Sequence, residues 1–409
     1  MSRARSGASF GVLALLCLAY AINAADRQLF STLLPAIRNA FGWDLKSSGL
    51  LSTAFTLGLA AVGIPAGYLV DRASRKAMIL VAMVVYSAFT LATIFAVGFW
   101  DMLVYRVLTG VGEGVQMAAL FAAVGGYFHR KRSLFIGWLI LAYGVGAFVG
   151  PRAGARLHLA ADSWRAPFVW FSISGLVIAG IVLAVVPSRY TESKGPQGNT
   201  AVGRAALEHM PTNLWNRNVV MGLVGCIILG FSLYGFMSLY AVFLKDELGF
   251  SGGETAAAFS FFGLGGLLSF VGGWCGDRFP QRRVIATAFA GLAAVGYSMY
   301  NIASSVGAQS LLTFLVGVFG SGFVFVTLLS LLQRSVRPEM VGRASGIFLT
   351  SVFGSASVAG YLFGTLAGAF RWGAAALIEL TLFPIIGVIA MGMVNPKQLI
   401  AVATKDQAG

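Results

Sequence analysis

The sequence predicts an all-α membrane protein with twelve transmembrane helices arranged as two pseudo-symmetric six-helix bundles. Three observations support this fold class. The 409-residue chain is 57% hydrophobic and only 11% charged, whereas an average soluble domain has about 25% charged residues. The apolar residues fall into blocks of about 20, the length that crosses roughly 30 Å of hydrocarbon. A polar segment divides these blocks into two sets that share a motif.

Each apolar block is expected to form one transmembrane helix. The runs are continuous rather than alternating, and they are too long for tilted barrel strands. The first block has no small-residue cleavage site and leads into another span, so we expect it to be retained. The twelve blocks are residues 12–34, 47–70, 77–98, 102–127, 133–155, 167–186, 218–244, 255–276, 284–304, 308–332, 343–368 and 373–394.

One polar stretch separates the sixth block from the seventh. It reads "PSRYTESKGPQGNTAVGRAALEHMPTN", from Pro187 to Asn213. Its glycine, proline and polar content is typical of a linker. We therefore predict an N-terminal bundle at 1–186, a cytoplasmic linker at 187–217 and a C-terminal bundle at 218–409.

A motif recurs at matching places in the two halves. "GYLVDRASRK" follows the second block and "GWCGDRFPQRR" follows the eighth, and both contain G-x-x-x-D-R followed by basic residues. The same offset of 206 positions relates Gly67 to Gly273 and Asp71 to Asp277. A motif repeated at equivalent positions indicates a duplicated fold.

The basic net charge of +14 is explained by the distribution of lysines and arginines between the two sides of the membrane. If the N-terminus is cytoplasmic, 20 of the 29 lysines and arginines lie on the cytoplasmic side and seven on the other. This is the positive-inside distribution. We expect a multi-pass protein of the cell inner (plasma) membrane with both termini cytoplasmic, surrounded by lipid, and no nucleic-acid partner.

Several motifs together resemble the major facilitator superfamily. They are the D-R loop already described, the segment "YRVLTGVGEG" from Tyr105 to Gly114, and a glycine series on the fifth block from Gly137 to Gly154. The glycine series is similar to one often associated with antiporters. The resemblance covers nearly the whole chain and implies two six-helix bundles that alternate access to a central site.

The first block narrows the resemblance. "NAADRQLFSTLLPAI", starting at Asn23, resembles the opening of the anion:cation symporter family, which includes galactonate, hexuronate and sialic acid carriers. "GVGEG" also fits that family. Spinster-like transporters share the D-R and G-E elements. Ala24 stands where the symporter family commonly has Tyr, so a hydroxyl ligand for a sugar acid is missing.

Charged residues within the spans are the strongest functional candidates, because buried charges are costly and tend to be functional. The first and fourth blocks carry Asp26, Arg27, Arg106 and Glu113. We expect Arg106 to bind a substrate carboxylate through its planar fork. An incoming anion would displace a carboxylate from Arg106, and that carboxylate would then take up a proton. The predicted proton-coupling residues are therefore Asp26 and Glu113. The alternative is a static lattice of ion pairs.

The remaining candidates are mostly hydroxyl, amide and aromatic groups. Glu379 is expected to be a carboxylate at the lipid edge, without function. A gate at the cytoplasmic helix ends is expected from Asp71, Arg72, Asp277 and Arg278. Further substrate-binding candidates besides Arg106 are Arg27, Asn23, Gln116, Tyr143, Tyr234, Ser238, Tyr240, Thr327 and Ser355.

No enzyme motif has the required setting. "GFSGG" matches G-x-S-x-G but lies in a short loop between spans, and zinc-protease and P-loop motifs are missing from the sequence. Three scattered cysteines indicate neither disulfides nor a metal site. We expect a monomeric, proton-coupled importer of a small organic anion, with no cofactor except the coupling proton. The alternatives are a proton-coupled exporter of drugs, lipids or metabolites, and a membrane receptor or scaffold without transport.

Overall fold

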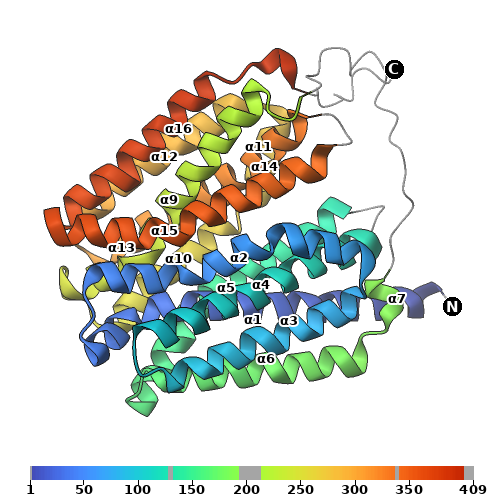
Figure 1. Ribbon diagram of the computed structural model, residues 1–409, viewed down its shortest axis with the longest axis horizontal. Coiled ribbons are helices and arrows are strands. Elements are labelled where there is room, and N and C mark those ends of the chain that lie inside the picture. Colours follow the sequence, from blue (N-terminus) through green and yellow to red (C-terminus); the bar gives the residue numbers. More distant parts are fainter. Residues whose placement is uncertain (1, 128–131, 193–212, 337–339, 400–409) are drawn as a thin grey trace.

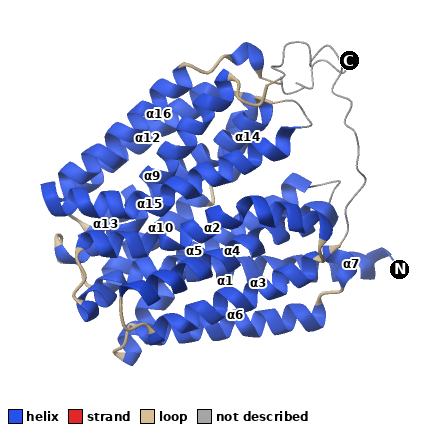
Figure 2. Cartoon of the chain, viewed as in Figure 1, coloured by secondary structure: helices blue, strands red, loops and turns tan. Residues whose placement is uncertain are grey.

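The computed structural model describes residues 2–127, 132–192, 213–336 and 340–399. This part of the chain consists of helices joined by short loops (Figure 2). Large apolar side chains such as Val81, Ile173 and Ile389 are exposed on the outside of the helices. Exposed apolar surface of this kind is suited to lipid rather than water.

The first set of helices lies before residue 193, and its last member, the short α7, falls inside the predicted linker 187–217. Asp44 accepts a hydrogen bond from the Ser47 backbone N–H and so caps the second helix, and Ser74 caps the third in the same way through Ala77. The helices are α1 (Ser2–Phe41), α2 (Leu45–Arg72), α3 (Arg75–Ala92), α4 (Phe99–Tyr127), α5 (Arg132–Ala161), α6 (Arg165–Val185) and the short α7 (Ser188–Thr191).

The second set of helices contains more interruptions of regular α-helical structure than the first. A π-helical segment, Gly317–Phe325, joins α13 to α14, and another, Leu377–Leu382, joins α15 to α16. The helices are α9 (Arg217–Asp246), α10 (Gly252–Gly266), α11 (Ser269–Arg278), α12 (Gln281–Asn301), α13 (Val306–Val316), α14 (Val326–Arg334), α15 (Val341–Ala376) and α16 (Phe383–Gly392).

Ten helical stretches of the described residues are long and apolar enough to span a membrane. One of them, Gly346–Gly392, is 47 residues long and contains a backbone break at Arg371, where φ is 73°. That break separates the eleventh predicted block from the twelfth. The predicted block 255–276 corresponds to two helices, α10 and α11. The all-helical membrane fold is confirmed, and the count of twelve spans stays a prediction.

The two sets of helices meet along close contacts between backbones. A Cβ added to Gly49 of α2 would lie 1.9 Å from the Gly360 carbonyl oxygen of α15. A Cβ on Gly263 of α10 would lie 2.4 Å from the Phe148 nitrogen of α5. Glycine is required at these places because any side chain would separate the helices. Figure 1 shows α2 beside α15 at this interface.

The interface differs between its two ends. At one end, Arg38 near the end of α1 forms an ion pair with Asp246 at the end of α9. Toward the other end, which holds α7, the two sets of helices diverge in Figure 1. A cavity of about 460 Å³ lies there between α5, α11, the start of α12 and α14, and its lining includes Ile140, Trp274 and Asp277. The structure is therefore closed at the Arg38 end.

Candidate functional site

Glycines of α4 bring the charged residues of this helix into the protein interior. A Cβ on Gly110 would lie 1.8 Å from the Phe55 carbonyl oxygen of α2, and one on Gly112 would lie 2.7 Å from the Tyr86 nitrogen of α3. With α4 held this closely against two helices, Arg106 and Glu113 are both buried. The "GVGEG" motif thus explains the burial of its own glutamate.

The glycines of α5 hold that helix against α1. A Cβ on Gly146 would lie 2.0 Å from the Ala21 carbonyl oxygen and 2.9 Å from the Ala24 Cβ. Ala24 is fully buried at this contact, so it serves helix packing, and a tyrosine in its place would force α1 and α5 apart. Position 24 therefore contributes to the contact between α1 and α5.

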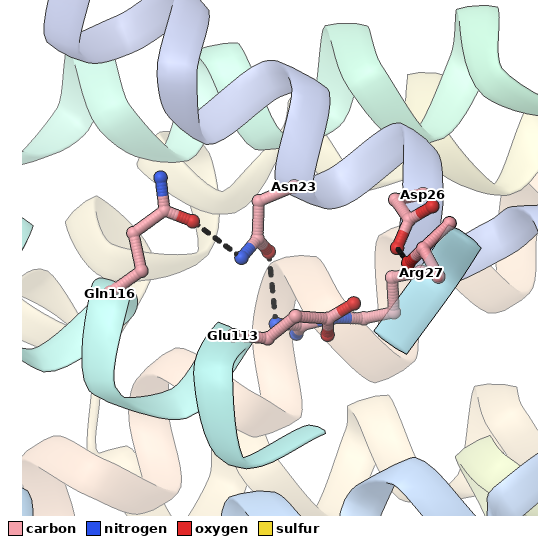
Figure 3. A network of polar contacts seen from close by, with 6 residues as sticks. Asn23, Asp26, Arg27, Glu113 and Gln116 are labelled. Atoms are coloured by element: carbon pink, nitrogen blue, oxygen red, sulfur yellow. Dashed lines mark hydrogen bonds and ion pairs between the residues drawn. The ribbon is translucent and has the colours of Figure 1, made fainter. Parts of the chain in front are cut away.

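A polar network connects α1 with α4 (Figure 3). Arg27 Nε donates to Glu113 Oε2 over 2.9 Å, and Arg27 Nη2 donates to Asn23 Oδ1 over 3.2 Å. Asn23 Nδ2 in turn donates to Gln116 Oε1 over 2.7 Å. All four side chains are buried. The charge of Arg27 is therefore compensated within the network by Glu113.

Asp26 points away from this network toward α3. Its Oδ2 accepts a hydrogen bond of 2.7 Å from the Thr90 hydroxyl. Its Oδ1 is buried and has no hydrogen-bond partner among the described residues. Adjacent helical residues point about 100° apart, which explains how Asp26 and Arg27 reach different helices.

Arg106 has no carboxylate partner within 4 Å in the described part of the chain. Its guanidinium carbon lies 4.6 Å from the ring centre of Phe30 and 5.2 Å from that of Phe55. Its Nε and Nη2 are buried without a described acceptor. The expectation that Arg106 has a carboxylate partner for an incoming anion to displace is therefore wrong for this structure. Positions 106 and 113 lie on one face of α4 but about 10 Å apart along the helix axis. Glu113 instead forms its ion pair with Arg27.

Two predicted aromatic residues lie beside the network. The Tyr143 ring centre is 5.6 Å from the Arg27 guanidinium carbon. Tyr234 of α9 packs against Phe55, with ring centres 6.1 Å apart, and lies within electrostatic range of Arg27. The second set of helices therefore contributes at least Tyr234 to the surroundings of the charged network.

Four other candidates bond elsewhere, mostly to the backbone of their own helices. Tyr240 donates to Gln309 Oε1 over 2.9 Å. The hydroxyls of Ser238, Thr327 and Ser355 donate to the carbonyl oxygens of Gly235, Phe323 and Ser351, respectively. None of these hydrogen bonds joins the charged network, so the substrate-binding role of these four residues stays a prediction.

The predicted gate lies at the open end. The side chain of Asp71 lies outside the described residues, and Arg72 and Arg278 are exposed. Asp277 lines the cavity of about 460 Å³ and lies within electrostatic range of Arg334. The gate role stays a prediction. An ion pair that does join the two sets of helices, Arg38–Asp246, lies at the opposite end.

The position of Glu379 differs from the predicted one at the lipid edge. It is fully buried in the π-helical segment, with 0% of its surface exposed, rather than lying at the lipid edge. The irregular turn directs it toward α9, where a Cβ on Gly235 would lie 2.3 Å from Glu379 Oε1. The sequence-based prediction assumed a regular α-helix, in which the side chain of Glu379 would point in a different direction from the one that the π-helical segment gives it.

The sequence profile of the Major Facilitator Superfamily matches residues 16–361. The chain belongs to the major facilitator superfamily. This match agrees with the helical fold and with the motifs on the second, fourth and fifth spans.

Individual relatives agree with the narrower resemblance. The chain is 29% identical to a hexuronate transporter of Bacillus subtilis over 59% of this chain and 57% of that protein. It is 25% identical to the 4-hydroxybenzoate transporter PcaK of Acinetobacter baylyi over 71% of each chain. The crystal structure of a bacterial homologue of the lysosomal transporter spinster superposes with a TM-score of 0.72 and 18% identity, covering 94% of this chain and 95% of the other. The family and these relatives are transporters rather than enzymes.

Sequence reasoning missed several neighbours of the charged residues. Thr90 is one of three hydroxyl residues in an apolar helix, beside Tyr86 and Ser87, and Phe30 and Phe55 are ordinary apolar residues of a span. Phe30 follows Arg27 by three positions, a spacing that places both on one side of α1. This spacing in the sequence suggests a contact of Phe30 with Arg27, but it does not show that the Phe30 ring packs against Arg106.

Proposed function

We propose that the protein is a proton-coupled secondary transporter that imports a small organic carboxylate by alternating access between two six-helix bundles. It would act in the cell inner membrane with both termini in the cytoplasm, so that the closed end with Arg38 and Asp246 faces outward. The positive-inside distribution supports this orientation.

The observation that carries the proposal is the environment of Arg106. A buried arginine with unused Nε and Nη2 donors offers an adjacent pair of N–H groups that fits a carboxylate. The aromatic faces of Phe30 and Phe55 hold the guanidinium through cation–π contacts. Binding an anion there supplies the missing acceptors and compensates a buried charge. Hexuronate and 4-hydroxybenzoate, named for two relatives, are both carboxylates.

Proton coupling is assigned to the two buried acids of the first set of helices, Asp26 and Glu113. Glu113 compensates Arg27 in the present structure, and Asp26 has one oxygen without a partner. A carboxylate bound at Arg106 would add a negative charge near both acids and thereby favour protonation of one of them. The proton and the anion would then bind with positive coupling.

The test is uptake of radiolabelled 4-hydroxybenzoate and glucuronate into proteoliposomes driven by an inward proton gradient, measured beside counterflow at equal pH. Arg106→Lys and Arg106→Ala should both lower uptake and counterflow by more than about tenfold, because a point charge lacks the planar fork. Asp26→Asn or Glu113→Gln should abolish accumulation while leaving counterflow. Near wild-type uptake by Arg106→Lys, or accumulation by both acid variants, would contradict the proposal.

A proton-coupled exporter is the second candidate, favoured by the similarity to spinster proteins, including 28% identity over 54% of this chain to spinster homolog 3 of Danio rerio. An exporter would acidify the vesicle lumen in exchange for substrate, whereas a symporter moves both in the same direction. A receptor or scaffold without transport would show no flux of either probe.

A further inference from the structure

Glu379 is a buried acid that the proposed mechanism does not use. Both of its carboxyl oxygens are buried and have no hydrogen-bond partner among the described residues. Its backbone oxygen accepts a hydrogen bond of 3.0 Å from the Ser232 hydroxyl of α9, which fixes this turn against α9. The side chain is therefore held between helices without a group that compensates a negative charge.

The π-helical turn and a glycine create this position. One-turn π-helical insertions occur often at functional sites because they change the direction of side chains. Here the turn directs Glu379 at Gly235, where a Cβ would lie only 2.3 Å from Oε1. Any larger residue at position 235 would displace the carboxyl group.

The groups that face Glu379 are neutral. Within the described residues, no lysine, arginine or histidine lies within 4 Å of its carboxyl group. Tyr300 of α12 lies within electrostatic range and its hydroxyl has no described partner, while Tyr240 of α9 is bonded to Gln309. Lys245 near the end of α9 and Arg371 of α15 are both exposed.

The adjoining cavity does not supply hydration either. It has a volume of about 10 Å³ and is lined mostly by apolar side chains, with Ser232 as the polar exception. Such a space is at the lower limit for one water molecule, and a stable buried water needs two to four polar partners. An ionised carboxylate without partner or water is strongly unfavourable, whereas a protonated carboxyl group is neutral.

We infer that Glu379 is a second proton-binding site, in the C-terminal set of helices, and that it carries its proton in this conformation. Release of the proton requires water, and hence separation of the π-helical segment Leu377–Leu382 from α9 and α12. Occupancy of the site therefore favours the conformation described here over one in which Glu379 is hydrated. The link to transport rests on the proposed function, whereas proton binding at Glu379 does not.

The first experiment detects the proton directly. Infrared spectra of the purified protein in lipid at neutral pH would be compared for wild type, Glu379→Gln and the control Glu247→Gln, which changes an exposed glutamate at the end of α9. The carbonyl band of one protonated carboxyl group, which shifts in D₂O, should be lost in Glu379→Gln and kept in Glu247→Gln. Loss of a carboxylate band instead would overturn the inference.

A second variant keeps the test valid if Glu379→Gln does not fold. Gly235→Ala retains the glutamate but places a Cβ against it, so the carbonyl band should shift in frequency. Gly354→Ala is the matched control, because a Cβ there meets no atom within 4 Å. An unchanged band in Gly235→Ala would contradict the location of the protonated group.

The third measurement tests the conformational role. Counterflow of 4-hydroxybenzoate would be followed from about pH 6 to about pH 9, a range above the ~4.3 at which exposed glutamate ionises. The wild-type rate should fall at least about threefold more across this range than the rate of Glu379→Gln, whose remaining pH dependence comes from Asp26 and Glu113. Equal pH profiles would refute the conformational role. If wild type moves neither probe, the proposed function fails while the infrared result still decides proton binding.

Discussion

The two sets of helices contain buried charge in different ways. In the first set, Arg27 and Glu113 form a hydrogen-bonded ion pair of 2.9 Å, extended by Asn23 and Gln116. In the second set, Glu379 has neither a cation nor a hydrogen-bond partner among the described residues. Burial of a charge is unfavourable in both places. Pairing solves the problem for Arg27 and Glu113, and a bound proton solves it for Glu379.

The repeated loops differ in a similar way. In the first loop, Glu192 accepts hydrogen bonds from the Ser74 hydroxyl and from the backbone N–H groups of Arg75 and Lys76, at 2.8, 3.1 and 3.0 Å. In the second loop, Gln281 Nε2 donates to the Ser330 hydroxyl over 2.7 Å. An ionised acid stabilises the first loop and a neutral amide stabilises the second, although the motif is shared.

The largest expected effect comes from separating the buried pair. Glu113→Gln leaves the charge of Arg27 uncompensated, and breaking a buried ion pair by removing one partner costs about 3–5 kcal/mol. Arg27→Gln should be similarly destabilising. The double variant should recover much of the loss, because neutral amides of similar size leave no unpaired charge. Unfolding of the four proteins in mixed micelles, followed by circular dichroism, gives the coupling free energy.

Glu379→Gln is the corresponding substitution in the second set of helices, and its effect on stability can be compared directly with that of Glu113→Gln. It should change the stability at neutral pH far less than Glu113→Gln, because it replaces a neutral group by another. A strictly additive Arg27–Glu113 cycle, or equal losses for the two glutamate variants, would remove the distinction between a paired and a protonated acid.

A smaller effect is expected from the ion pair that joins the two sets of helices at the closed end. Arg38 and Asp246 are partly exposed, so their interaction is worth only about 0.2–1 kcal/mol. Asp246→Asn should therefore shift the conformational equilibrium toward separation of these helix ends by up to about fivefold. Cysteine pairs across the ends of α1 and α9 should crosslink more slowly in this variant, and Glu247→Gln is the neighbouring control. Unchanged crosslinking would show that the backbone contacts at Gly49 and Gly360 alone keep this end closed.

The smallest effect concerns Glu192 and acid. Burial alone would raise the pKa of Glu192, but the hydrogen bonds from Lys76, Arg75 and Ser74 outweigh it and lower the pKa below its usual value. A lowered folded-state pKa means that the stabilisation is present above about pH 4.3 and is lost as the pH falls through the folded-state value. Wild type should therefore lose more thermal stability than Glu192→Gln on acidification below about pH 4.3. Parallel melting curves would show that the loop contacts do not contribute.

The sequence by itself determined the membrane class, the helical fold and the family resemblance. Apolar blocks of about 20 residues can satisfy their backbone only as helices in lipid, and the glycine motifs of "GVGEG" and of the fifth span supported the family resemblance. It also located Asp26, Arg27, Arg106 and Glu113 as buried charges. The exceptional cost of charge in a membrane makes such residues visible without a structure.

Only the tertiary structure decided which of these groups meet. Helical spacing placed Arg106 and Glu113 on one face, yet Glu113 bonds to Arg27 and Arg106 packs on Phe30. Glu379 was assigned to the lipid edge, and a π-helical turn directs it inward. Contacts within a helix follow from its regular period, whereas partners on different helices depend on their rotation, depth and local irregularities. Those quantities arise from packing of the whole bundle, and no short stretch of sequence encodes them.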